Sequence, residues 1–77
     1  MTADDLIDLL VTRLVREHGG AKHLWRRRVG AVKLYSLTTH AHCNWAIAPT
    51  GSAKQIDAIE NLIDDLRLSY PILSGAR

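Results

Sequence analysis

Residues 22–49 read KHLWRRRVGAVKLYSLTTHAHCNWAIAP, and this stretch decides the fold that we expect for the whole chain. It holds five of the ten Lys and Arg residues and none of the eight Asp and Glu residues, which all lie before or after it. It also contains both tryptophans, three of the four histidines and the only cysteine. The flanking segments have the apolar period of helices, whereas β-favouring residues alternate within the stretch. The sequence therefore predicts a basic, aromatic, strand-prone middle between two acid-bearing amphipathic helices.

The segment before this stretch predicts a helix over roughly residues 3–18. Its apolar residues share one side and are Leu6, Ile7, Leu10, Val11, Leu14 and Val15. Thr2 followed by Asp5 suits a helix start, and Gly19 and Gly20 end the helix. Leu9 falls among the polar residues, which predicts either an isolated surface leucine or a contact for a partner or a second copy.

The segment after the basic stretch predicts another helix over roughly residues 53–68. Ser52 and Gln55 match the capping box, in which each side chain bonds the backbone N–H of the other residue. The apolar stripe of this helix consists of Ile56, Ile59, Leu62, Ile63 and Leu66. A separate acidic ridge on its side consists of Asp57, Glu60 and Asp64. Pro71 keeps the apolar tail, residues 70–73, from continuing the helix.

The basic stretch itself predicts two strands and one ambiguous element. Residues 31–37 and 43–48 alternate in character and contain β-favouring types, and the polar residues 38–42 between them predict an antiparallel hairpin. In the second strand Cys43, Trp45 and Ile47 alternate with Asn44, Ala46 and Ala48. Residues 22–29 favour a short helix that stops at Gly30. An edge strand, in which Trp25, Arg27 and Val29 alternate, is the alternative.

These elements predict a single α+β domain over residues 1–77, with two amphipathic helices on one face of a small antiparallel sheet in two layers. The order is α-β-β-α, or α-β-β-β-α if residues 22–29 are a strand. The second order is similar to that of the double-stranded-RNA-binding domain. The resemblance covers the order of elements only and carries over no functional residue. That family has a run of lysines at the start of its second helix, where this chain has Lys54 alone, followed by Asp57 and Glu60.

The expected core contains Leu10, Leu14, Trp45, Ile47, Ile59, Leu62, Ile63 and Leu66. A chain of this length buries only about 60% of its unfolded surface, so a second subunit would add stability. Pairing of two hairpins in a homodimer would also complete the sheet, and Leu9, Ile72 and Leu73 are apolar groups that a second subunit could cover. One cysteine excludes an internal disulfide.

The sequence excludes several functional classes. The N-terminus lacks the pattern of a signal peptide and no apolar run approaches the roughly 20 residues of a membrane span, so we expect a cytoplasmic protein without membrane contact. No motif of a nucleophilic, nucleotide-binding or zinc-dependent enzyme is present, and we expect no catalytic activity and no cofactor. A metal site at His40, His42 and Cys43 is an alternative, but two histidines in a hairpin loop are more often solvated, and the spacing is not that of a zinc finger.

The charge pattern favours a binding protein. Arginine forks pair with phosphates or carboxylates, and exposed aromatic rings stack on bases, so residues 22–33 could bind nucleic acid. A surface divided into basic and acidic zones instead favours steering onto a protein. The leading hypothesis is a small non-catalytic regulatory protein that docks onto another protein, a profile typical of bacterial accessory proteins and phage-encoded inhibitors. The candidate partner-binding residues are Trp25, Arg26, Arg27, Arg28, Lys33, Tyr35, Asp57, Glu60 and Asp64.

Overall fold

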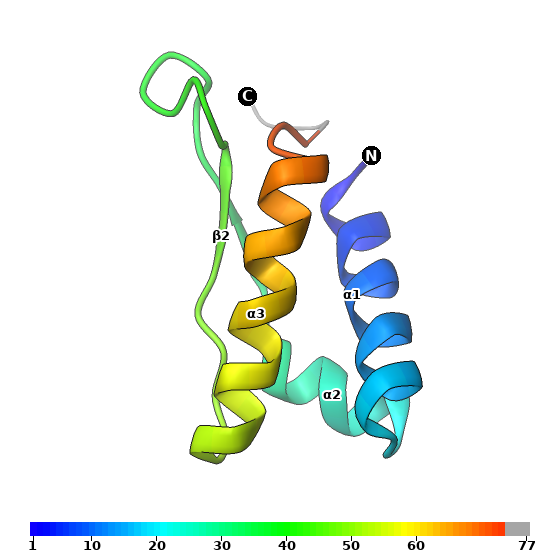
Figure 1. Cartoon of the computed structure of the whole chain (residues 1–77). Coiled ribbons are helices and arrows are strands. Elements are labelled where there is room, and N and C mark those ends of the chain that lie inside the picture. Colours follow the sequence, from blue (N-terminus) through cyan, green and yellow to red (C-terminus); the bar gives the residue numbers. More distant parts are fainter. Residues whose placement is uncertain (74–77) are drawn as a thin grey trace.

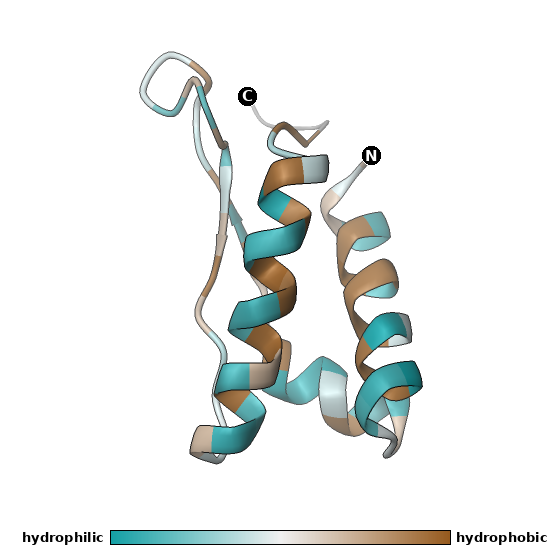
Figure 2. Ribbon diagram, in the orientation of Figure 1, coloured by the Kyte–Doolittle hydropathy of each residue, from teal (hydrophilic) through white to brown (hydrophobic). Residues whose placement is uncertain are grey.

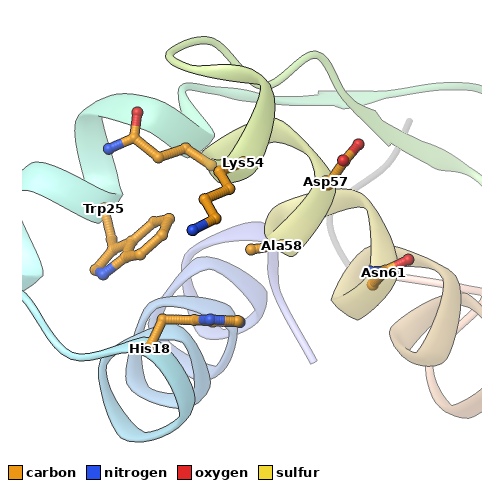
Figure 3. A pocket seen from close by; sticks show the side chains of 7 residues that line it. His18, Trp25, Lys54, Asp57, Ala58 and Asn61 are labelled. Atoms are coloured by element: carbon orange, nitrogen blue, oxygen red, sulfur yellow. The ribbon is translucent and has the colours of Figure 1, made fainter.

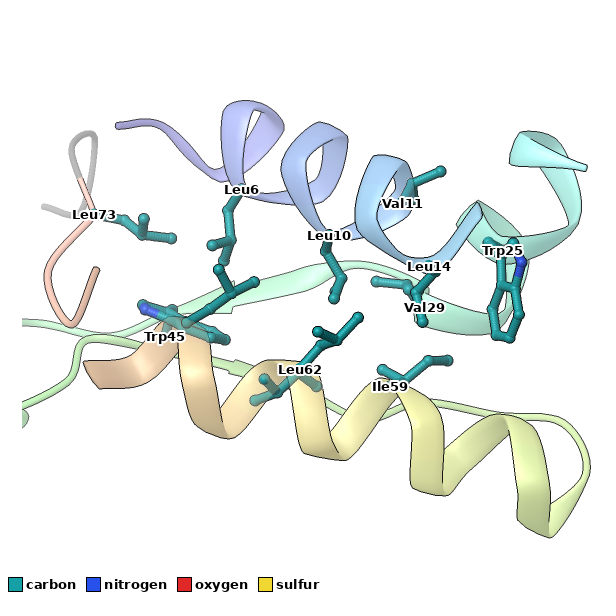
Figure 4. Packing of buried hydrophobic residues seen from close by; sticks show 12 residues of the cluster. Leu6, Leu10, Val11, Leu14, Trp25, Val29, Trp45, Ile59, Leu62 and Leu73 are labelled. Carbon is teal, nitrogen blue, oxygen red and sulfur yellow. The ribbon is translucent and has the colours of Figure 1, made fainter. Parts of the chain in front are cut away.

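The computed structural model describes residues 1–73, and Figure 1 shows how their elements are arranged. Within these residues the order is α1 (Ala3–His18), α2 (Lys22–Val29), β1 (Val32–Leu34), β2 (Trp45–Ile47) and α3 (Ala53–Ser69). The two long helices α1 and α3 run antiparallel, α2 crosses near one end of them, and the β1–β2 hairpin lies along their side (Figures 1 and 4). The predicted α+β class, with two amphipathic helices on a small antiparallel sheet, is confirmed.

Both long helices begin at the capping boxes that the sequence predicts. The Asp5 N–H donates to Thr2 Oγ1 over 3.2 Å and the Gln55 N–H donates to Ser52 Oγ over 3.2 Å, and both reciprocal bonds are present. The hydrogen bonds from Thr2, first of all that from its backbone N–H, hold the pKa of the Asp5 carboxyl below its ordinary value.

Among the described residues, no helix combines the length and the apolar character needed to cross a membrane.

Residues 22–29 form a helix, so the strand alternative for this segment is wrong and the order is α-α-β-β-α. The order that resembles the double-stranded-RNA-binding domain is therefore absent from the described residues. Trp25 and Val29 are four residues apart and both buried, as on one side of a helix, while Arg27 is exposed. A strand would place all three on the same face and bury an arginine without a partner. Gly30 ends the helix with a positive φ of 72°.

The hairpin is antiparallel, as predicted, but its strands are shorter than expected. The register pairs Val32 with Ile47, Lys33 with Ala46, and Leu34 with Trp45. One further bond, from the Tyr35 N–H to the Asn44 carbonyl over 2.8 Å, continues the pairing. Ser36 then starts a turn, because its carbonyl accepts bonds from the N–H groups of Thr39 and His40. Because this turn begins at Ser36, β1 ends earlier than residue 37, which is where the alternating sequence predicts its end.

The core lies between the two long helices and the hairpin (Figure 4). Its buried apolar residues are Leu6, Leu10, Val11, Leu14, Trp25, Val29, Trp45, Ile59, Leu62, Ile63, Leu66 and Leu73. Figure 2 shows that each long helix has a hydrophobic and a hydrophilic side. Every predicted core residue is buried except Ile47, which is half-buried and packs against the cluster. Leu9 is also half-buried against the core, so it is not an isolated surface leucine.

The chain after α3 folds back onto the hairpin through Asn44. This side chain is fully buried: its amide N–H donates to the Leu73 carbonyl over 3.0 Å, and its oxygen accepts the Leu73 N–H over 2.8 Å. The Asn44 N–H bonds the Pro71 carbonyl, and the Trp45 indole N–H bonds the Tyr70 carbonyl over 2.9 Å. Leu73 is thereby only 2% exposed, so it fills the protein's own core and is not left for a second subunit.

Candidate binding surfaces

The three consecutive arginines of α2 have three different environments. Arg27 points outward, is exposed and makes no ion pair within residues 1–73. Arg26 is exposed but forms an ion pair with Asp8 of α1. Arg28 is half-buried, and its carbonyl accepts the Thr50 N–H over 2.8 Å. Only Arg27 of the three therefore offers an unpaired guanidinium on an open surface.

Arg28 packs beneath the turn that leads into α3. A Cβ atom placed on Gly51 would lie 2.8 Å from Arg28 Cδ, and the φ of Gly51 is 120°. Arg28 Nε is buried and has no hydrogen-bond partner in the described part of the chain. The positive φ explains why glycine occupies the turn, and the close approach of Arg28 Cδ shows that the Arg28 stem packs against it.

The aromatic candidates of the basic stretch are occupied within the protein. Trp25 is 7% exposed, and its indole N–H donates to the Gly19 carbonyl over 2.7 Å. Tyr35 stacks on His40, with ring centroids 4.2 Å apart and planes tilted by 19°. Trp25 leaves only a small part of its ring open and one face of Tyr35 is covered by His40, so both rings offer less stacking surface than exposed aromatic residues do. Lys33 lies on β1 and is exposed.

The alternative metal site is not assembled in the described residues. His40 shares a 2.9 Å hydrogen bond with Thr39 through Nδ1, while His42 is exposed. Cys43 is half-buried and its Sγ lies 3.5 Å from the Trp45 carbonyl oxygen. Residues 1–73 contain no group of three or more His, Cys, Asp or Glu side chains able to hold a metal ion. The expectation that the protein needs no metal stays a prediction.

The acidic ridge is exposed on α3, as its spacing implies. Asp64 lies 3.9 Å from an Arg67 nitrogen, whereas Asp57 and Glu60 make no ion pair in the part of the chain that the structure describes. Glu60 and Asp64 also border a small hollow of about 170 Å³ between α3 and Ile47 of β2. The ridge thus offers two uncompensated carboxylates on a rigid helix.

A larger groove lies where the end of α1, the side of α2 and the start of α3 meet (Figure 3). Its volume is about 460 Å³, and its lining residues are His18, Trp25, Lys54, Gln55, Asp57, Ala58 and Asn61. The Lys54 ammonium points into it between Trp25 and Ala58 (Figure 3). Sequence reasoning missed this groove, because its walls come from three elements whose relative positions no local pattern specifies.

Comparisons of the chain with protein-family models, with curated proteins and with solved structures found no match.

Proposed function

We propose that this chain is a small non-catalytic protein that docks onto another protein. The observation that carries the proposal is that exposed charges of both signs, held on helices and a strand, make no ion pair within residues 1–73. Arg27 and Lys33 are exposed cations on α2 and β1, and Asp57 and Glu60 are exposed anions on α3. Fixed charges of opposite sign on rigid elements steer a partner into one orientation and disfavour partners of the wrong charge.

Nucleic-acid binding by residues 22–33 is the competing function, and the environments of these residues favour it less. Phosphate binding draws on several unpaired cations, and base stacking needs open aromatic faces. Arg26 is paired with Asp8, Arg28 packs under a turn, and Trp25 is buried. A regulatory role in the cytoplasm, of the kind that bacterial accessory proteins and phage-encoded inhibitors perform, belongs to the proposal, and self-association stays a prediction.

Capture from a lysate of the organism that encodes the chain separates the two functions. The immobilised protein is expected to retain a protein partner after nuclease treatment, and Arg27→Glu combined with Lys33→Glu is expected to release it. Arg16→Glu, at another exposed and unpaired arginine, is the matched control and is expected to retain the partner.

Direct titration with DNA and RNA oligonucleotides completes this test. Binding is expected to be weak and independent of sequence near physiological salt. A submicromolar complex with one defined oligonucleotide, with an affinity that falls steeply as salt rises, would make nucleic-acid binding the better assignment.

A further inference from the structure

The groove between α1, α2 and α3 is built on a fixed aromatic wall. Trp25 is held by its hydrogen bond to the Gly19 carbonyl. Gly20, with a φ of 92°, packs so closely that a Cβ there would lie 3.3 Å from the indole nitrogen. Ala58 supplies a small side chain on the opposite side, which leaves the hollow open. Its volume of about 460 Å³ exceeds that of any single side chain. The groove is therefore a surface hollow with a fixed Trp25 wall, and an apolar group can enter it once the Lys54 side chain turns aside.

The groove has a positively charged side chain, Lys54, near Trp25 and a negatively charged one, Asp57, farther along. The Lys54 ammonium points over the apolar surface of Trp25 and Ala58 (Figure 3). It makes no ion pair within residues 1–73, and neither does Asp57 at the far side of the groove. The imidazole of His18 also lies on the Trp25 side, with its ring centroid 6.1 Å from the indole. An incoming segment thus meets a cation beside the apolar surface and an anion beyond it.

We propose that the groove binds an acidic segment of the protein partner, with an apolar side chain between Trp25 and Ala58 and a neighbouring carboxylate on Lys54. This inference rests on the proposed docking function and specifies the partner's chemistry. The bound segment would shield the Lys54–carboxylate pair from water, which makes such a pair stronger than one on an open surface. Asp57 would repel a segment bound in the reverse orientation, so the groove selects direction as well as composition.

A second copy of this chain is a poorer occupant. Its most exposed large apolar side chain is Leu68, one turn after Asp64 and Asp65 on α3. If Leu68 of one copy entered the groove of another, the acidic α3 faces of the two copies, each with Asp57, Glu60, Asp64 and Asp65, would come close together. Like charges brought together in this way oppose association. A separate acidic protein meets Lys54 without carrying this α3 face with it.

The first experiment uses synthetic peptides as the probe. Three peptides share one leucine and differ only in the residues beside it, which are glutamate, serine or lysine. The glutamate peptide is expected to shift the NMR signals of the Trp25 indole N–H and of the Ala58 amide saturably. Binding of the serine and lysine peptides is expected to be weaker by roughly tenfold or more, the change that loss of one shielded ion pair gives. Equal affinities for all three peptides, or shifts located away from the groove, would overturn the proposal.

Two variants test the groove directly. Lys54→Glu removes the cation, and Ala58→Leu fills the hollow with a residue that suits a helix. Each is expected to reduce binding of the glutamate peptide by roughly tenfold or more, while Arg16→Glu, at an exposed arginine that neither lines the groove nor belongs to the proposed docking cations, leaves it unchanged. Circular dichroism confirms that each variant is folded. Undiminished binding in both folded groove variants would contradict the assignment.

Capture and sedimentation distinguish this inference from the docking function on which it rests. If a nuclease-resistant partner stays bound to both groove variants, the groove assignment fails and the docking function stands. If the wild-type protein captures no protein, the docking function fails. Dimers at micromolar concentration that Ala58→Leu dissociates would show that a second copy fills the groove, and this result would also overturn the proposal.

Discussion

The two tryptophans lie at opposite ends of one core (Figure 4). Each donates its indole N–H to a backbone carbonyl, Trp45 to Tyr70 and Trp25 to Gly19. At the Trp45 end the chain after α3 returns to cover the core, and the Arg67 guanidinium lies 5.5 Å from the indole centroid. At the Trp25 end no segment within residues 1–73 covers the groove. The same residue type, with the same kind of hydrogen bond, thus closes one end of the core and forms the wall of a surface hollow at the other.

Trp45→Ala should give the largest effect. Trp45 is 2% exposed and belongs to the buried cluster that includes residues of both long helices, so its removal leaves a large cavity. We expect the free energy of unfolding to fall by roughly 3–5 kcal/mol, measured by chemical denaturation. Leu68→Ala, at a leucine that is 85% exposed, is the control and should change stability by less than about 0.5 kcal/mol. A loss near zero for Trp45→Ala would mean that the hairpin does not close this end of the core.

Asn44→Ala should give the next largest effect. The substitution removes both partners of the Leu73 backbone groups in a fully buried site, and we expect a loss of about 1–3 kcal/mol. It should also speed hydrogen exchange of the Leu73 amide, because the tail then opens without unfolding the rest. Asn61→Ala, at an exposed asparagine of α3, is the matched control and should change neither measurement. If the two substitutions gave equal results, the tail would not be held by Asn44 in solution.

The elements that could be predicted from the sequence are those with local causes. The capping boxes at Thr2 and Ser52 and the apolar periods that follow them act within a few residues of chain, so α1 and α3 have nearly the predicted bounds. The short helix at residues 22–29 was favoured correctly, because Gly30 gives a local stop signal. Exposure of the acidic ridge also follows from helical spacing alone.

The features that could not be predicted depend on contacts between distant parts of the chain. The bonds between Asn44 and Leu73 join residues 29 apart in sequence, and the ion pair of Arg26 with Asp8 joins residues 18 apart. Nothing in the run of three arginines distinguishes the exposed Arg27 from Arg28, which is half-buried by a turn formed more than twenty residues later. Only the three-dimensional structure shows which cations are exposed to a partner and which are paired or packed within the protein.

The smallest effect should come from Trp25→Phe, and it compares the two ends directly. The substitution removes the hydrogen bond to the Gly19 carbonyl, but Gly19 is exposed, so water can replace the indole N–H. The lost volume enlarges an open groove and leaves no closed cavity, so we expect a loss of about 0.5–1.5 kcal/mol. Trp45→Phe is the matched substitution at the covered end, where the smaller ring leaves empty space among buried side chains, and its cost should be larger. Denaturation of the two variants under the same conditions measures the difference. A cost at Trp25 equal to or above that at Trp45 would mean that the groove end is as tightly closed as the other, and a preformed hollow beside Lys54 would then have no physical basis.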